Sequence, residues 1–429
     1  MSRLWAIAAL LLMASGAVGQ PVVSGVSGEI VRNGSITISG EGFGIKGVPA
    51  PVAYEDFQSF YAMVDSAGED DWVTIMDVPF GSSGIDYVED GYADGHSFEK
   101  YLRNSGMKGA ASIVGGSADP PPSRYDGDTA MLSPYGWGAY DSVEYTGDRP
   151  IRGSNKGMGI YRDLFSKRWY VSWWGYRHAA VGTDHVVAGN SKLFANITGP
   201  QVNGYPGIRH DIAELHNSES PGGRNLYDCE GHAWGTDFRE SFIGPSLRWN
   251  EHARFDCYIE FENPGKYWAN YGGEVLADSV YGGRSYEYDD EGCPGLAADQ
   301  VWIGNFFSTN GAVGASTDGY LDIYHSEVYI DTTQARVEIG DAEIWNDCVH
   351  REILLPTGWS ATSITATLND GLNGETTAGR QFVAGELAYI YVIHRNGDVN
   401  AEGYPVTIGG TVAPGAPGQP QNVTATEID

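Results

Sequence analysis

Basic residues are scarce in this chain of 429 residues, which carries 26 Lys and Arg against 56 Asp and Glu, for a formal net charge of −30. Binding of nucleic acid depends on neutralising phosphates with Lys and Arg, so we expect no nucleic-acid partner. Acidic polymers such as uronic-acid chains would also be repelled unless a local basic patch exists. The simplest consequence of the excess acid is solubility.

Cysteine is equally rare, with only Cys229, Cys257, Cys293 and Cys348. An even count in an exported chain permits two disulfides in any of three connectivities. Because Cys257 shares its strand face with apolar neighbours, a buried free thiol is an equal alternative. There is no CxxC or Cys/His spacing of the kind that holds zinc, and we expect no metal and no cofactor. Acid-rich loops such as residues 288–291 leave structural Ca²⁺ as an alternative, although no loop spells the EF-hand pattern.

Long apolar runs are also lacking, apart from residues 4–14, which follow Arg3 and precede small residues ending at Gly19. This order is typical of a secretory signal peptide, here residues 1–19. The run is too short to span a membrane, and no other stretch approaches that length. We therefore expect a secreted, extracellular or cell-surface protein without a membrane span.

Helical periodicity is nearly absent, and only residues 97–102 favour a short helix. Residues 22–47 hold two short strands, which bury too little apolar surface to be stable without partners. Complementary strands occur only in residues 335–410, where Asn396 and Gly397 between alternating runs predict a type I′ turn. Together the two stretches contain about seven strands, the size of one immunoglobulin-like sandwich.

Three segments of this discontinuous domain resemble a known family, namely residues 37–44, 359–367 and 396–400. They are similar to the opening and the later strands of IPT/TIG-type immunoglobulin-like domains. Such domains are mostly spacers or interaction modules in extracellular proteins. The resemblance implies that this domain serves placement rather than chemistry.

Residues 53–333 form an insert that is rich in Gly, Tyr and Trp and carries period-2 strands. Its clearest strands are expected at residues 168–177, 192–197, 208–215, 253–262, 300–307, 320–325 and 327–332. The two ends of an inserted domain must lie close together. We therefore expect residues 54–57 to pair with residues 327–331.

The order of these segments resembles the concanavalin A-like jelly roll of lectins, glucanases and several polysaccharide lyases. The resemblance is carried by residues 55–57, the aromatic strand 169–176, residues 247–249 and the closing residues 328–331. It implies a concave sheet face that could hold a glycan chain. The predicted fold is thus all-β, a concanavalin A-like jelly-roll sandwich inserted into a discontinuous IPT/TIG-like β-sandwich.

Residues 411–429 follow this domain. Residues 411–420 are rich in Pro, Gly and Ala and are typical of a linker. Residues 420–426 resemble the first strand of a fibronectin type III domain.

Catalytic candidates are weak. His210, Glu214 and His216 share one strand face by alternation, and a lyase needs a base and a group that neutralises the uronate carboxylate. Ile212 on the same face favours instead a hydrated strand without chemistry. The Arg-x-Glu-x-Arg and Gln-x-His signatures of alginate lyases with this fold do not occur in the sequence.

Residues 287–291 match the Glu-x-Asp-x-Glu spacing of retaining glucanases with this fold, in which two carboxylates act as nucleophile and acid/base. Gly-rich flanks indicate a loop rather than a strand. Spacing alone is a poor guide in so acidic a chain, and a loop is the simpler interpretation.

Aromatic residues give the stronger binding argument, because sugar rings stack on indole and phenol faces. In residues 168–177 alternation places Tyr170, Trp174 and Tyr176 on one side, and Trp169, Trp173 and Arg177 on the other. In residues 253–262 the polar set is expected to point outward, into the groove, and Trp268 and Tyr271 to form the rim in a Gly-rich turn. The predicted carbohydrate-binding residues are Trp174, Tyr176, Arg254, Tyr258, Trp268 and Tyr271.

Three functions remain open from the sequence. The leading hypothesis is a secreted or cell-surface polysaccharide-binding protein, with a lectin-like jelly roll mounted on an immunoglobulin-like module and a glycan as its partner. The alternative is a polysaccharide-degrading enzyme, a lyase rather than a glycoside hydrolase. A third reading is a structural subunit of a surface layer or filament, which would self-associate without sugar.

Overall fold

The computed structural model describes residues 19–56, 72–75, 86–87, 111–115, 129–136, 158–179, 191–198, 209–216, 226–233, 236–243, 252–260, 265–272, 274–281, 298–303, 306–307, 320–369 and 382–412. Within the strands of residues 53–333, side chains are described at 53–55, 166–176, 252–260, 266, 268–270, 301 and 325–331. Residues 1–18 of the predicted signal peptide, the short helix at 97–102, the acid-rich loop at 288–291 and residues 413–429 lie outside the described residues.

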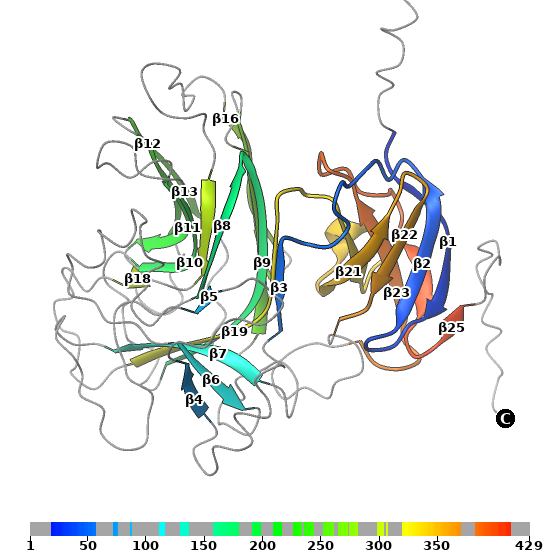
Figure 1. The fold of residues 1–429 in the computed structure, drawn as a ribbon, viewed down its shortest axis with the longest axis horizontal. Coiled ribbons are helices and arrows are strands. Elements are labelled where there is room, and N and C mark those ends of the chain that lie inside the picture. The colour runs from blue at the N-terminus through cyan, green and yellow to red at the C-terminus, as the bar shows by residue number, and fades with distance from the viewer. Residues whose placement is uncertain are drawn as a thin grey trace, which may run out of the picture. The chain divides into compact units, whose positions relative to one another are not determined.

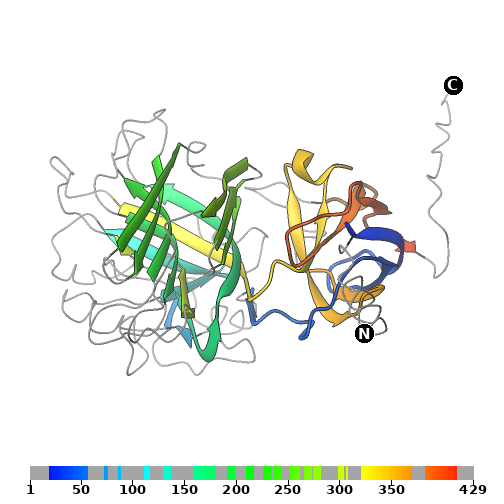
Figure 2. The same cartoon turned by 90° about the horizontal axis from the view of Figure 1, so that it is seen from above.

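The chain divides into two compact units. The first, here called the split unit, comprises Met1–Pro51, Thr333–Gly374 and Arg380–Asp429, and the second, the inserted unit, comprises Val52–Thr332 and Glu375–Gly379. Both are built from strands (Figures 1 and 2). The one helix among the described residues is a 3-10 turn, Trp345–Asp347. No helix in the part of the chain that the structure describes has the length and apolar character needed to cross a bilayer.

The split unit is an eight-stranded antiparallel assembly in the order β24-β23-β20-β21-β22-β2-β1-β25. Strands β2 and β22, from opposite ends of the sequence, pair directly, with Ile38 opposite Ile364. The strands are β1 (Val22–Glu29), β2 (Ser35–Glu41), β20 (Arg336–Gly340), β21 (Arg351–Trp359), β22 (Ser363–Thr367), β23 (Leu387–Ile393), β24 (Tyr404–Thr407) and β25 (Thr411–Val412).

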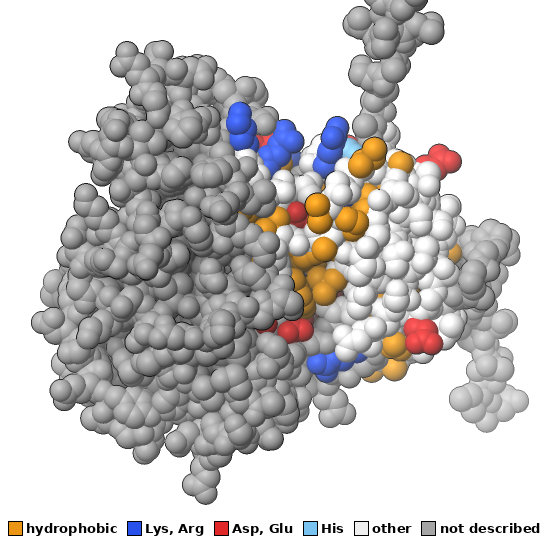
Figure 3. All heavy atoms as spheres, viewed as in Figure 1, with side chains coloured by type: hydrophobic (Ala, Val, Ile, Leu, Met, Phe, Trp, Pro, Cys, Tyr) orange, Lys and Arg blue, Asp and Glu red, His pale blue; other side chains and the backbone are white. Residues whose placement is uncertain are grey.

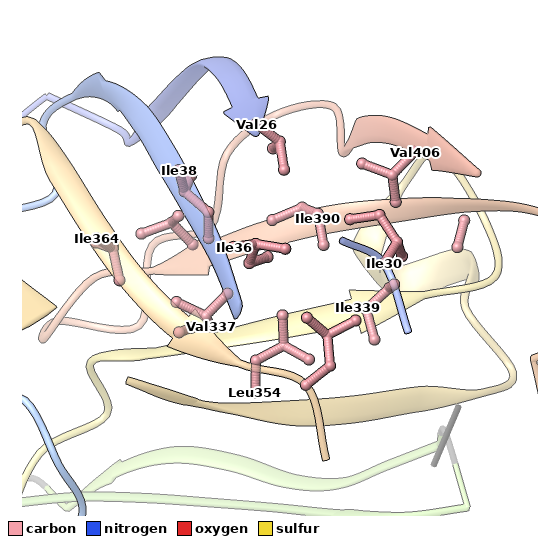
Figure 4. Packing of buried hydrophobic residues seen from close by; sticks show 14 of the residues in the cluster. Val26, Ile30, Ile36, Ile38, Val337, Ile339, Leu354, Ile364, Ile390 and Val406 are labelled. Atoms are coloured by element: carbon pink, nitrogen blue, oxygen red, sulfur yellow. The ribbon is translucent and has the colours of Figure 1, made fainter. Parts of the chain in front are cut away.

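The core of the split unit follows from period-2 alternation. In β2, Ile36 and Ile38 are buried while Ser35 and Ser39 are exposed, which is the pattern of a strand with one face on a core. Apolar side chains from both sequence stretches converge in one cluster (Figure 4). On the surface of the described residues, orange hydrophobic side chains are visible among white ones (Figure 3), and the most exposed large ones are Ile45 and Val48.

The turn after β23 differs from the predicted type I′ turn. Gly397 has φ of 92°, whereas Asn396 is absent from the residues with positive φ. The amide of Gly397 donates to the carbonyl oxygen of His394 at 2.9 Å, and the amide of His394 donates to that of Asp398 at 2.7 Å. This is a three-residue connection of a type I turn followed by a left-handed Gly, because the loop is one residue longer than a type I′ hairpin allows.

A buried ionic cluster fastens the segment after β20 to the sheet. Glu338, with no exposed surface, accepts hydrogen bonds from Arg336 Nε at 2.8 Å and from Trp345 Nε1 at 2.7 Å. Arg351 Nε lies 3.7 Å from the second oxygen of Glu338, and its guanidinium stacks over the Trp345 ring at 3.9 Å. The segment also carries Cys348, which is buried beside Tyr391.

The inserted unit contains two antiparallel sheets, in the orders β13-β12-β11-β10-β17-β8-β5 and β16-β15-β14-β9-β19-β7-β6-β4. This is the layered, jelly-roll-like, all-β arrangement expected from the sequence. In the first sheet β18 also pairs with β10, and in the second β3 also pairs with β19. The strands are β3 (Ala53–Glu55), β4 (Trp72–Ile75), β5 (Asp86–Tyr87), β6 (Ala111–Gly115), β7 (Thr129–Gly136), β8 (Met158–Ser166), β9 (Arg168–Ala179), β10 (Ser191–Thr198), β11 (Arg209–His216), β12 (Leu226–Ala233), β13 (Thr236–Ile243), β14 (His252–Glu260), β15 (Gly265–Tyr271), β16 (Glu274–Tyr281), β17 (Ala298–Ile303), β18 (Phe306–Phe307) and β19 (Tyr320–Asp331).

The expected pairing of the two ends of the insert is confirmed. Strand β3 runs antiparallel to the end of β19, with Glu55 opposite Val328 and Tyr54 opposite Tyr329. The two strands predicted at 320–325 and 327–332 are one strand. Its register with β9 shifts between Ser326 and Tyr329, and Glu327 there has φ of 50°. A β-bulge thus interrupts the alternation without ending the strand.

Candidate functional site

The candidate site lies on the central strands of the second sheet, whose two faces differ in chemistry. Cross-strand pairs on one face join Trp173 of β9 to Phe255 of β14, and Val171 to Cys257. The rings of Trp173 and Phe255 lie 4.6 Å apart. This is the apolar face, because all four side chains are buried and carry no ionisable group other than the thiol.

The opposite face, called the polar face below, carries titratable and aromatic side chains from five strands. Strand alternation and the cross-strand registers place its described members together. They are Arg168, Tyr170, Ser172, Trp174 and Tyr176 of β9, His252, Arg254, Asp256, Tyr258 and Glu260 of β14, Lys266, Trp268 and Asn270 of β15, Ser326, Tyr329 and Asp331 of β19, and Tyr54 of β3.

Five of the six predicted carbohydrate-binding residues lie on this face. Trp174 stands directly opposite Arg254, and Tyr258 stands directly opposite Trp268. Tyr176 stands opposite His252, with their ring centroids 4.8 Å apart. The registers place Trp174 and Tyr176 on one side of Asp256 along the strands, and Tyr258 and Trp268 on the other.

A buried hydrogen-bond network occupies the centre of the polar face. Arg254 Nε donates to Asp256 Oδ1 at 2.9 Å and to Ser172 Oγ at 3.1 Å, and Arg254 Nη2 lies 2.8 Å from Asp256 Oδ1. Tyr170 Oη donates to Asp256 Oδ1 at 2.7 Å and accepts from Arg254 Nη2 at 3.1 Å. The guanidinium is thus neutralised inside the protein by a carboxylate two residues away on the same strand face.

One oxygen of that carboxylate takes no part in the network. Asp256 Oδ2 is buried and has no hydrogen-bond partner, although Asp256 as a whole is only 1 % exposed. Buried carboxylate oxygens normally accept hydrogen bonds because desolvating them is costly. Asp256 therefore offers one unused acceptor.

Near the start of β9, at the more exposed end of the polar face, a tyrosine and an arginine again share one carboxylate oxygen. Tyr258 Oη donates to Glu260 Oε1 at 2.5 Å, and Arg168 Nε lies 3.1 Å from the same oxygen. The Arg168 side chain is 45 % exposed and that of Glu260 is 22 % exposed. On the neighbouring strand, Tyr329 Oη donates to Asp331 Oδ2 at 3.1 Å, and its ring meets Tyr170 edge-on at 5.9 Å.

The polar face is more enclosed than the sequence suggests. Arg254 and Tyr258, expected to point outward, do lie opposite the apolar face, but they are only 5 % and 1 % exposed. Trp174 and Trp268 are each 9 % exposed, so neither stands on an open rim. Alternation along a strand identifies a face, but it does not reveal what covers that face.

The predicted Gly-rich turn carrying Trp268 and Tyr271 is wrong, because both residues belong to strand β15. Aromatic residues favour strands, and this preference prevails over the flanking Pro264 and Gly272. Tyr271 pairs in register with Phe255, a position of the apolar face, whereas Trp268 occupies the polar face. The side chain of Tyr271 lies outside the described residues.

The weak catalytic candidates His210, Glu214 and His216 all lie on β11, in the other sheet of the inserted unit. The ladder between β11 and β12 shifts register between Asp211 and Glu214, so the uninterrupted alternation behind their shared face is broken there. Their side chains lie outside the described residues, as does the whole of the glucanase-like segment 287–291. Their roles stay predictions.

Cys257 and Cys348 are free and buried, so the structure joins neither in a disulfide. Burial raises the pKa of the Cys257 thiol, and the adjacent Asp256 carboxylate raises it further. Burial likewise raises the pKa of Cys348. Neither thiol is therefore a ready thiolate at neutral pH. In the part of the chain that the structure describes, no group of three or more His, Cys, Asp or Glu side chains could hold a metal ion.

Sequence reasoning missed Ser172, Asn270, Tyr329 and Asp331 as members of the polar face. Each becomes recognisable only through its partner, since Ser172 faces Asp256 and Tyr329 faces Ser172 in register. The alternation Lys266, Trp268, Asn270 was the available signal for the β15 contribution.

No family model and no curated protein matches this chain. Solved structures similar to it include an endo-β-1,4-glucuronan lyase from the fungus Trichoderma reesei, at 10 % identity over 66 % of this chain and 96 % of that one, with a TM-score of 0.34. An alginate lyase from a Chlorella virus shows 16 % identity over 49 % and 87 %, with a TM-score of 0.30. The cellulose-induced protein Cip1 shows 13 % identity over 52 % and 86 %, also with a TM-score of 0.30. Likeness at this level carries no argument about the reaction or the ligand.

Proposed function

We propose that this chain is an exported polysaccharide-binding protein, in which a concanavalin A-like inserted unit binds a glycan and an IPT/TIG-like split unit serves as its mount. The observation that carries the proposal is the polar face. It places Trp174 and Tyr176 on one side of Asp256, and Tyr258 with Trp268 on the other, so that the network of Arg254 and Asp256 lies between two aromatic pairs. Sugar rings are recognised by aromatic rings on which they stack and by fixed polar groups between those rings.

Preorganisation supports binding on this face. The network holds Tyr170, Ser172 and Arg254 in single orientations through Asp256, so a ligand would not have to immobilise them. Binding sites gain affinity when such ordering is completed before the ligand arrives. Because the central side chains are covered in this structure, a glycan must enter from the end of Arg168 and Glu260 or displace the cover.

The same network favours binding over lyase chemistry at this face. A lyase must neutralise the uronate carboxylate so that the neighbouring proton becomes acidic. The positive charge of Arg254 is already compensated by Asp256 at 2.8 Å, and breaking a buried pair of this kind costs about 3–5 kcal/mol. The arginine therefore acts here as a fixed positioning group.

Retention on polysaccharide affinity gels tests the proposal. The wild-type chain should be retarded by at least one polysaccharide, and Tyr258→Phe and Trp174→Phe should weaken that retardation by about three- to tenfold, or about 0.7–1.4 kcal/mol. Tyr391→Phe, a matched change in the split unit, should leave it unchanged. Failure of the wild type to bind any polysaccharide in a broad panel refutes the proposal.

Two further readouts separate the other readings. Release of unsaturated products, followed by their absorbance, would assign the chain to the lyases, and light scattering that shows assembly without sugar would favour a structural subunit. Export is tested by sequencing the N-terminus of the mature protein, which should begin at Gln20 if residues 1–19 are removed.

A further inference from the structure

The polar face carries cations, but two of them are already engaged by carboxylates of the same face. Arg254 is paired with Asp256 at 2.8 Å and Arg168 with Glu260 at 3.1 Å. A polyanion approaching this face would have to compete with those internal carboxylates.

The charges on the polar face also argue against binding of a polyanion. Its described members include three cations (Arg168, Arg254 and Lys266) and three carboxylates (Asp256, Glu260 and Asp331). Among these described members there is therefore no surplus of positive charge to attract a uronate, a sulfate or a phosphate. The chain as a whole, at −30, adds a long-range repulsion of any polyanion.

None of the described side chains of the polar face donates a hydrogen bond to Asp256 Oδ2. Oδ1 of this carboxylate receives Tyr170 and Arg254, whereas Oδ2 is buried with no hydrogen-bond partner. Tyr170 and Arg254 fix the carboxylate plane, so Oδ2 has a defined direction rather than a choice of rotamers. The natural complement of such an oxygen is a neutral hydroxyl, because an anionic group would be repelled and a second buried cation would have to be desolvated.

We propose that Asp256 is the specificity-determining residue of the polar face, that its Oδ2 accepts a hydrogen bond from a ligand hydroxyl, and that the ligand is a neutral polysaccharide rather than a uronate. This inference rests on the proposed polysaccharide-binding function and adds the class of glycan. In this assignment Trp174 and Trp268 contribute ring stacking, which is indifferent to charge, whereas Asp256 supplies the discrimination.

The test compares neutral polymers (β-glucan, xylan and mannan) with uronate polymers (alginate and glucuronan) on the full chain, by affinity electrophoresis and calorimetry. Neutral polymers should bind and uronates should not. Asp256→Asn should weaken neutral binding about tenfold, because a charge-assisted hydrogen bond is roughly twice as strong as a neutral one. The matched control Asp398→Asn, an exposed carboxylate of the split unit, should leave affinity unchanged.

Ionic strength gives a readout that needs no variant, and it covers the case in which Asp256→Asn does not fold. Affinity for a neutral ligand should be nearly constant between about 0.05 and 0.5 M salt, whereas affinity for a polyanion would fall steeply. Uronate binding that weakens with salt, or unchanged affinity in folded Asp256→Asn, would overturn the assignment while leaving polysaccharide binding in place. Absence of binding to every polymer would overturn both.

Discussion

Glu338 should control the stability of the split unit alone. It is fully buried and holds Arg336 at 2.8 Å and Trp345 at 2.7 Å, with Arg351 at 3.7 Å. Glu338→Gln removes the carboxylate that pairs with both buried guanidinium groups. Breaking a buried ion pair from one side costs about 3–5 kcal/mol, because the remaining charge stays desolvated.

The two buried thiols provide an assay that separates the units. Cys348 lies in the segment fastened by Glu338, whereas Cys257 lies in the sheet of the inserted unit, and burial raises the pKa of both. Each should react with a thiol reagent only when its own unit unfolds. Pulse labelling across a urea series, with the labelled peptides identified by mass spectrometry, then gives one unfolding midpoint for each unit.

The expected size of the effect follows from the urea dependence of unfolding. With a slope of about 2 kcal/mol per molar urea, a loss of about 3–5 kcal/mol lowers the Cys348 midpoint by roughly 1.5–2.5 M. The Cys257 midpoint should stay in place. Glu343→Gln, which removes an exposed carboxylate of the same segment, is the matched control and should shift neither. Equal shifts for Glu338→Gln and Glu343→Gln, or a shift confined to Cys257, would refute the reasoning.

Two other predictions concern the split unit. Gly44→Ala should lower its stability by about 1–3 kcal/mol, because Gly44 has φ of 71° and an added Cβ would lie 2.6 Å from a ring nitrogen of His394. Gly47→Ala meets nothing within 4 Å and should be nearly neutral in the same thermal melt, so equal effects would contradict this explanation. Burial also raises the pKa of the Cys348 thiol and of the Tyr391 phenol. Both groups therefore stay neutral in the folded protein, and as pH rises they lose their protons in the unfolded chain first. The contribution of these two groups to stability should therefore be constant below about pH 8 and decline above about pH 9. Tyr391→Phe should reduce that decline in pulse proteolysis across urea. A decline of the same slope in Tyr391→Phe would exclude the tyrosine as a cause.

The strands could be predicted where one face is apolar and the other is not. Ile36 and Ile38 alternate with Ser and Thr, and Phe255 alternates with Arg254 and Asp256, so both faces of β2 and β14 follow from the sequence. The pairing of the ends of the insert, Tyr54 with Tyr329, followed from the geometric need of an insertion. These are local or topological constraints, and both can be read without knowledge of neighbouring strands.

The remainder depends on contacts that a single sequence does not contain. The bulge at Glu327 looks like a strand end because it breaks the alternation, and only the ladder to β9 shows that pairing continues. Trp268 looks like a turn residue because Pro and Gly flank it, until its pairing with Tyr258 is known. The low exposure of the polar face was equally hidden, since Arg254 contacts Tyr170 and Ser172, which lie more than 80 residues away in the sequence.

The pairing of β2 with β22 has a consequence for how the protein is made. Strands β1 and β2 leave the ribosome early, but their partners from β20 onward follow almost three hundred residues later, about 15–60 s at typical rates of synthesis. During that interval the β1–β2 hairpin has a free strand edge, and the intervening chain has time to fold before the split unit can close. Strands Val22–Glu29 and Ser35–Glu41 contain many Ser, Thr and Gly residues. A weakly hydrophobic hairpin of this kind is a poor template for aggregation while its partner strands are still missing. The topology therefore favours one order of assembly, in which the inserted unit folds first and the strands of the split unit pair last.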